Sequence, residues 1–201
     1  SYGDYVITEA GFGADLGAEK FFNIKCRKSG LRPKLSVIVV TAQGLKMHGG
    51  TPEKDIKSPD LIGLQKGLSN LEKHLNNLAS FGQSVVVAFN KYAFDTSEEI
   101  ETVSRFCEER GASFAVNEAF TNGGEGAVEL AEKVVEAIEK SPSGELKFTY
   151  SEKDDIVTKI TKIATRIYGA HDVVLSETAL KKLRLMQGTD LERMPVCIAK
   201  T

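Results

Sequence analysis

The chain alternates short apolar runs with longer segments in which apolar residues recur every three or four positions. The runs at residues 35–42 and 84–89 are apolar on both faces and are bounded by polar loops. Such runs are typical of strands buried in a parallel sheet. The predicted strands are residues 4–9, 35–42, 84–89, 112–116 and a last one that begins at residue 195.

The longer segments have the period of amphipathic helices that turn one apolar face toward a core. The clearest one has Ser58 as predicted N-cap and Pro59 at the first helical position, and it ends at Gly82. Another begins with the capping box of residues 96–99, Thr-Ser-Glu-Glu. The predicted helices are residues 18–28, 59–81, 96–111, 127–139, 154–168 and 176–186.

The order of these elements predicts the fold class. Strand and helix alternate up to residue 140, which is the signature of an α/β fold built from parallel sheets with crossover helices. The linker at residues 140–144 interrupts the alternation, and a mostly helical portion at about 154–187 follows. Because ligands of open parallel sheets bind beyond the carboxyl ends of the strands, the loops at those ends are the first places to look for a site.

Two of these loops carry aromatic rings. Tyr92 and Phe94 follow the strand at 84–89, and Phe120 follows the strand at 112–116. If the two strands are neighbours, the rings could flank a planar ligand, with each stacking face contributing about 0.5–1.5 kcal/mol beyond area burial. The same rings could instead close the top of the sheet, and spacing alone leaves both interpretations open.

Two other loops contain residues that could bind a ligand or transfer a proton. Residues 11–17 contain three glycines and Phe12, with the spacing G-x-G-x-x-x-G, which is neither a dinucleotide fingerprint nor a P-loop. A tight strand-to-helix turn and a nucleotide contact both fit this loop. Residues 43–50 place Lys46 and His48 after a strand, where they could bind anionic oxygens, transfer a proton or be merely solvated.

Composition excludes several classes of protein. A net charge of −2 over 201 residues argues against a nucleic-acid-binding surface or a polybasic membrane patch. No apolar run approaches the roughly 20 residues that span a bilayer, and no secretory signal is visible. The three cysteines fit neither a disulfide framework nor a zinc pattern, so we expect a cytoplasmic protein and assign no residue to a metal.

Several segments resemble one enzyme family. Residues 8–27, TEAGFGADLGAEKFFNIKCR, look like a hallmark segment of the formate–tetrahydrofolate ligases, also called formyltetrahydrofolate synthetases. Five further segments extend the resemblance in order along the whole chain. They are residues 45–50, 70–74, 123–126, 167–170 and 195–201.

The resemblance implies a reaction and a set of site residues. In the family, ATP phosphorylates formate to formyl phosphate, and tetrahydrofolate attacks it to give 10-formyltetrahydrofolate, ADP and phosphate. Magnesium is required, and a monovalent cation, potassium or ammonium, activates the enzyme. The folate-binding positions fall on Tyr92, Ala93 and Phe120, where the family usually has a Phe-Pro pair and a tryptophan. Glu9 and Phe12 fall on the nucleotide side. Lys46 and His48 are candidates for catalysis, and Gln43 replaces a family arginine.

The resemblance also implies what surrounds this chain. The family has a P-loop NTPase-like fold, and its P-loop lies upstream of the matching segment. We therefore expect an internal fragment that is inactive alone, with two partial domains around a cleft. Residues 1–80 would complete the nucleotide-binding domain, and residues 81–201 would carry the folate site. A homotetramer is the expected assembly. The alternative is a non-catalytic α/β module that binds folate or a nucleotide.

Overall fold

The computed structural model describes residues 3–199, which fall into two compact units. Unit 2 consists of residues 33–146, and unit 1 consists of the described parts of residues 1–32 and 147–201. The chain therefore begins in unit 1, builds all of unit 2, and then returns to unit 1. Within residues 3–199, no helix is both long enough and apolar enough to cross a membrane.

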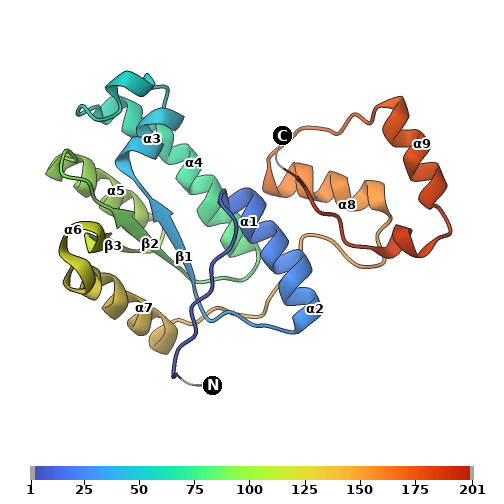
Figure 1. Ribbon diagram of the computed structural model, residues 1–201, viewed down its shortest axis with the longest axis horizontal. Helices are drawn as coiled ribbons and strands as arrows, with labels where there is room; N and C mark the ends of the chain where they lie inside the picture. Colours follow the sequence, from blue (N-terminus) through green and yellow to red (C-terminus); the bar gives the residue numbers. More distant parts are fainter. Residues whose placement is uncertain (1–2, 200–201) are drawn as a thin grey trace. The chain divides into compact units, whose positions relative to one another are not determined.

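A three-stranded parallel sheet is the framework of unit 2 (Figure 1). Its strands lie in the order β1 (Ser36–Val40), β2 (Val85–Asn90) and β3 (Ser113–Asn117). The central strand β2 is buried along its middle, as expected for a strand that helices cover on both faces. The predicted parallel α/β fold and these three predicted strands are confirmed.

Three helices cover the sheet: α4 (Leu61–Ser80), α5 (Ser97–Glu109) and α7 (Val128–Lys140). Helices α4 and α5 contact each other and lie in consecutive crossovers, so the right-handed rule places them on one face. Helix α7 packs against β2 and β3. The buried leucines of α4 are those of the predicted apolar stripe, which confirms it as a core-facing helix.

Helix α3 (Ala42–His48) packs on α4 at unusually short range. A Cβ atom added to Gly67 would lie 1.9 Å from the carbonyl oxygen of Leu45, and one added to Gly49 would lie 1.7 Å from that of Gly63. Only glycine lets the two backbones approach so closely. This contact fixes α3, and with it Lys46, against the start of α4.

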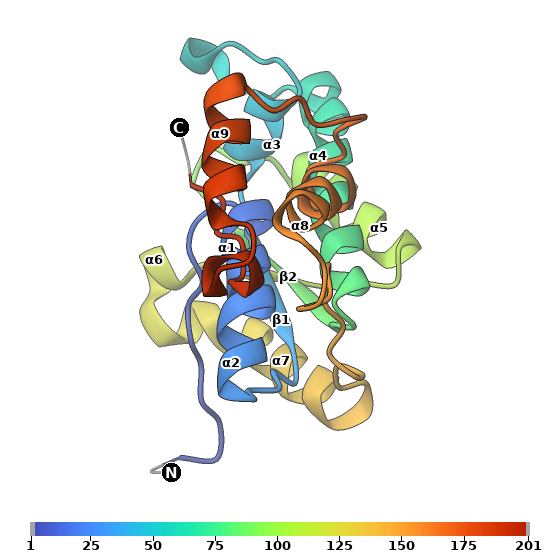
Figure 2. The same ribbon diagram turned by 90° about the vertical axis from the view of Figure 1, so that its right-hand side faces the viewer.

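Unit 1 is built around one continuous helix. Helix α1 (Ala14–Lys20) passes through a π-helical stretch (Phe21–Cys26) into α2 (Arg27–Ser29), and Figure 2 shows α1 and α2 along one rod. The helix ends at Gly30, whose φ of 74° is left-handed.

Two side chains join this helix to the second part of unit 1. The buried Asn23 side chain donates to Thr149 Oγ1 at 3.0 Å and accepts from Thr149 N at 2.9 Å. The Arg27 guanidinium donates to the Tyr150 carbonyl at 2.7 Å and lies over the rings of Phe148 and Tyr150.

The remaining elements are mostly short. Helix α8 (Ile156–Lys162) continues into a second π-helical stretch (Ile163–Ile167), and α9 (Glu177–Met186) follows, which confirms the predicted helical portion. The short helices are α6 (Ala119–Asn122) and the 3-10 turns Glu53–Asp55, Gly123–Ala127 and Asp190–Arg193.

Two predicted strands are wrong. Residues 4–9 and 195–199 adopt no strand, and residues 200–201 lie outside the described part of the chain. Residues 4–9 are exposed, with Ile7 92% accessible. A β-prone sequence becomes a strand only where a neighbouring strand accepts and donates its hydrogen bonds, and the described sheet offers neither segment such a partner.

Three boundaries also differ from prediction. The predicted loop at 43–50 is largely helix α3, which Thr41 caps by accepting a hydrogen bond from Gly44 N. Helix α4 is capped by Asp60 rather than Ser58, because the carboxylate accepts from Gly63 N at 2.9 Å. The first helix begins at Ala14, four residues earlier than predicted.

The predicted boundary between residues 80 and 81 lies inside unit 2. Strand β1 precedes it, yet pairs with β2 from Ser36 to Val40 in a single sheet. The division of the chain into a nucleotide part and a folate part concerns ligand binding, and it stays a prediction.

Candidate functional site

The carboxyl ends of β2 and β3 lie next to each other and are joined by side chains. Asn117 Nδ2 donates to Asn90 Oδ1 at 2.7 Å across the last register pair of the two strands. One residue later in each strand, Lys91 Nζ lies 2.8 Å from Glu118 Oε1. The condition that the two aromatic loops follow neighbouring strands is therefore met.

The loop after β2 is a compact turn. Tyr92 N donates to Asp95 Oδ2 at 2.8 Å, and Asp95 N donates to the Tyr92 carbonyl at 3.0 Å. The rings of Tyr92 and Phe94 stack with centroids 5.5 Å apart and planes 8° from parallel, so one face of Tyr92 is already occupied. Burial raises the pKa of Asp95 above its ordinary value, even though the hydrogen bond from Tyr92 N lowers it.

The loop after β3 presents Phe120 to solvent. Phe120 lies on the short helix α6 and is 97% exposed. The loop closes through the hydrogen bond from Glu118 N to the Gly126 carbonyl at 2.9 Å, and a Cβ on Gly126 would lie 2.5 Å from the backbone of Glu118. The aromatic ring is therefore displayed by a tightly closed loop and does not plug the sheet.

Lys46 and His48 have different surroundings. His48 is exposed at the end of α3. Lys46 is fully buried, and its Nζ lies 2.8 Å from Glu99 Oε1 and 3.0 Å from the Ser58 carbonyl. The capping box identified Glu99 only as a helix start; its long-range partner could not be found in the local pattern.

Glu99 is held in its ionised form by this network. Burial favours the neutral acid, but hydrogen bonds from Lys46, from Thr96 and from the Asp60 backbone together keep its pKa below the ordinary value. The carboxylate accepts from Asp60 N at 3.2 Å, and therefore also supports the residue that caps α4.

The lowered pKa of Glu99 predicts a pH dependence of stability. The unfolded chain binds the proton more tightly, so the contribution is fully present above the ordinary value of 4.5 and is lost as the pH falls through the lower folded pKa. In urea titrations, we expect the free energy of unfolding of the wild type to exceed that of Glu99→Gln at neutral pH, and this difference to shrink as the pH falls below 4.5. An advantage that is the same in neutral and acidic buffer would contradict an ionised Glu99.

The residues predicted for the nucleotide side lie in unit 1. Glu9 and Phe12 line a cavity of about 450 Å³ together with Lys20, Phe21 and Lys25. Lys25 Nζ lies 5.0 Å from the centre of the Phe21 ring, and Phe12 is 83% exposed. The structure therefore places both predicted residues around one cavity that also contains two cationic side chains.

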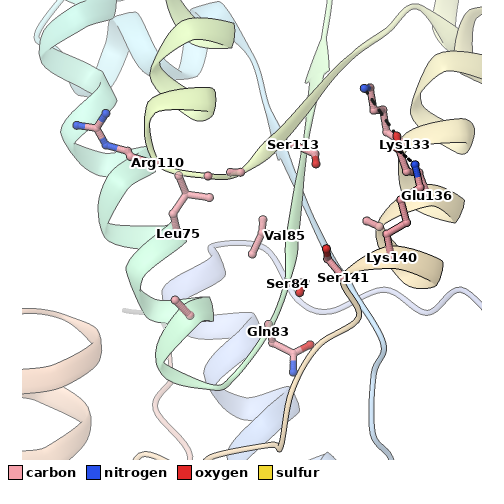
Figure 3. Close-up of a pocket in the computed structure, with 14 residues that line it drawn as sticks. Leu75, Gln83, Ser84, Val85, Arg110, Ser113, Lys133, Glu136, Lys140 and Ser141 are labelled. Atoms are coloured by element: carbon pink, nitrogen blue, oxygen red, sulfur yellow. Dashed lines mark hydrogen bonds and ion pairs between the residues drawn. The ribbon is translucent and has the colours of Figure 1, made fainter.

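A second cavity, of about 530 Å³, lies at the opposite end of the sheet from the aromatic loops (Figure 3). Its walls include Ser84 and Ser113, where β2 and β3 begin. Two of its cations, Lys133 and Lys140, pair with Glu136 at 4.0 Å and 2.9 Å. Parallel sheets bind ligands at the other end, so this cavity is not part of the candidate site.

Comparison with known proteins assigns the family. The family model described as formate–tetrahydrofolate ligase matches residues 1–201. Formate–tetrahydrofolate ligases of Parabacteroides distasonis and Bacteroides thetaiotaomicron are each 59% identical over all 201 residues, and that of Porphyromonas gingivalis is 52% identical. The chain spans about 36% of the length of these relatives. The chain belongs to the formate–tetrahydrofolate ligase family.

Proposed function

We propose that this chain is part of an enzyme that ligates formate to tetrahydrofolate with ATP, through formyl phosphate, to give 10-formyltetrahydrofolate, ADP and phosphate. The family match over residues 1–201 is the observation that carries this proposal. The chain itself contains no G-x-x-x-x-G-K-[ST] motif. Phosphoryl transfer depends on groups that position and neutralise the phosphates, so we expect this segment to be inactive alone.

We assign the folate wall to Tyr92, Ala93 and Phe120. The bridged ends of β2 and β3 support this assignment, because they bring the two aromatic loops to the same edge of the sheet. Phe120 is almost fully accessible and Tyr92 is 41% exposed, so both rings can contact a ligand. A pterin ring between two aromatic faces would gain stacking energy from each of them.

We assign the nucleotide side to Glu9 and Phe12. Their shared cavity supports the assignment, since Lys20 and Lys25 supply positive charge and Phe12 and Phe21 supply aromatic surface. Cationic side chains suit phosphate groups, and rings suit a purine. ATP with magnesium, activation by potassium or ammonium, and a homotetramer rest on the family resemblance. The P-loop NTPase-like fold rests on it too.

Ring removal tests the folate wall. In the full-length protein that contains this chain, Tyr92→Ala and Phe120→Ala are each expected to raise the KM for tetrahydrofolate about tenfold or more, because each removes one stacking face and its buried area. Initial rates at varied tetrahydrofolate measure this effect. Phe120→Leu keeps apolar volume without a ring, so its KM for tetrahydrofolate should lie between those of the wild type and Phe120→Ala.

Val174→Ala is the control, since Val174 is an exposed apolar residue of unit 1. We expect it to leave the KM for tetrahydrofolate unchanged. Wild-type KM values in both ring variants would refute the folate wall. A different result would replace the ligase proposal by the alternative of a non-catalytic binding module. In that result, the full-length protein binds tetrahydrofolate and yet forms no ADP from ATP in the presence of formate.

A further inference from the structure

Among the ion pairs of residues 3–199, the Lys46–Glu99 pair has the least exposed side chains. Both side chains are 0% exposed, and their charged atoms are 2.8 Å apart. Lys46 Nζ donates a further hydrogen bond to the Ser58 carbonyl at 3.0 Å. A buried amine of this kind cannot contact a substrate. Lys46 can therefore affect the site only through its partners, the Glu99 carboxylate and the Ser58 carbonyl.

The second carboxylate oxygen of Glu99 holds the start of α5. Glu99 Oε2 accepts from Thr96 N at 3.0 Å and from Thr96 Oγ1 at 3.1 Å. Thr96 Oγ1 in turn accepts from Glu99 N at 3.2 Å, which completes the capping box. Lys46 therefore fixes one oxygen of a carboxylate whose other oxygen fixes Thr96.

Thr96 directly follows the aromatic turn. The preceding residue, Asp95, is joined to Tyr92 by two hydrogen bonds: Tyr92 N donates to the Asp95 carboxylate, and Asp95 N donates to the Tyr92 carbonyl. The turn thus has one end on β2 and the other on Thr96. A continuous series runs from Lys46 through Glu99 to Thr96, along the chain to Asp95, and by hydrogen bonds to the backbone of Tyr92. The Tyr92 ring stacks on Phe94 within the same turn.

We propose that Lys46 is a positioning residue for the folate wall: by fixing the Glu99 carboxylate, it holds the turn of residues 91–95 and the orientation of the Tyr92 ring. This inference rests on the proposed folate site. It also distinguishes Lys46 from a core lysine that only stabilises the fold, because it predicts a local effect on one turn and on one substrate.

Hydrogen exchange in the full-length protein tests the local effect. In Lys46→Met, we expect the amides of Tyr92, Asp95 and Thr96 to exchange about tenfold faster. The amides of α7 that exchange through local opening, and not through global unfolding, should keep their wild-type rates. The KM for tetrahydrofolate should rise and the KM for ATP should stay unchanged. The control Lys140→Met breaks an exposed ion pair with Glu136 and should change none of these values.

Several outcomes would overturn the inference. They are unchanged exchange in the turn, equal acceleration in the turn and in the locally exchanging amides of α7, and faster exchange in the turn with a wild-type KM for tetrahydrofolate. If Lys46→Met does not fold, Lys46→Met/Glu99→Gln removes both charges and permits the same comparison. Failure of the proposed folate site has a separate signature, which is a wild-type KM for tetrahydrofolate in both Tyr92→Ala and Phe120→Ala. The exchange rates are measured without folate and test the turn independently.

Discussion

Replacing Lys46 by methionine is expected to lower the free energy of unfolding by about 3–5 kcal/mol, the usual cost of removing one partner from a buried ion pair. Methionine fills much of the space but leaves the Glu99 carboxylate fully buried without its cationic partner. The cost comes from this stranded charge more than from the lost attraction. Urea unfolding of wild type and variant measures it directly.

The double variant Lys46→Met/Glu99→Gln should recover most of this loss. It removes both charges, and the glutamine carbonyl can still accept a hydrogen bond from Thr96 N at the start of α5. Lys140→Met is the matched control, because Lys140 is 73% exposed beside Glu136 and surface pairs contribute about 0–1 kcal/mol. Equal losses in the single and double variants would show that the charge is not what matters.

Gly67→Ala is expected to lower the free energy of unfolding by about 2–3 kcal/mol, even though alanine favours helix by about 1 kcal/mol over glycine. The added methyl group would lie 1.9 Å from the Leu45 carbonyl oxygen. That oxygen cannot move away freely, since it accepts from Gly49 N at 2.9 Å in the last turn of α3. Relief of the clash must therefore separate α3 from α4.

Gly124→Ala is the control for this substitution. A Cβ at Gly124 meets no atom within 4 Å, so we expect a change within about 0.5 kcal/mol. Urea midpoints of the two variants against wild type give the comparison. If Gly67→Ala proves as stable as Gly124→Ala, the short approach of α3 to α4 does not constrain the fold.

Local patterns predicted the elements whose signals are complete within a few residues. The apolar run at 84–89 corresponds to β2, and the Thr96–Glu99 capping box forms with both of its hydrogen bonds. The same holds for the leucine stripe of α4. The capping box contains both partners of its hydrogen bonds within four residues, and the apolar run and the leucine stripe indicate burial directly through their own pattern.

The predictions that failed depended on distant partners. Residues 4–9 have the composition of a strand, but pairing decides whether a strand forms. Asp60 caps α4 in place of the predicted Ser58, and Asp60 N donates to Glu99 Oε1, 39 positions further along the chain. The Lys46–Glu99 pair spans 53 positions, and no periodicity in either helix indicates it. The aromatic residues of the candidate site were found because strand ends are visible in the sequence.

The discontinuity of unit 1 has a consequence for the order of events during synthesis. Asn23 and Arg27 bind partners 126 and 123 residues further along the chain, and all of unit 2 is translated in between. Unit 2 closes on itself where Ser143 N donates to the Lys34 carbonyl at 2.8 Å. Domains fold as units while the ribosome is still elongating the chain, and long-range contacts form late. The contacts of Asn23 with Thr149 and of Arg27 with Tyr150 can therefore form only after the whole of unit 2 has been synthesised.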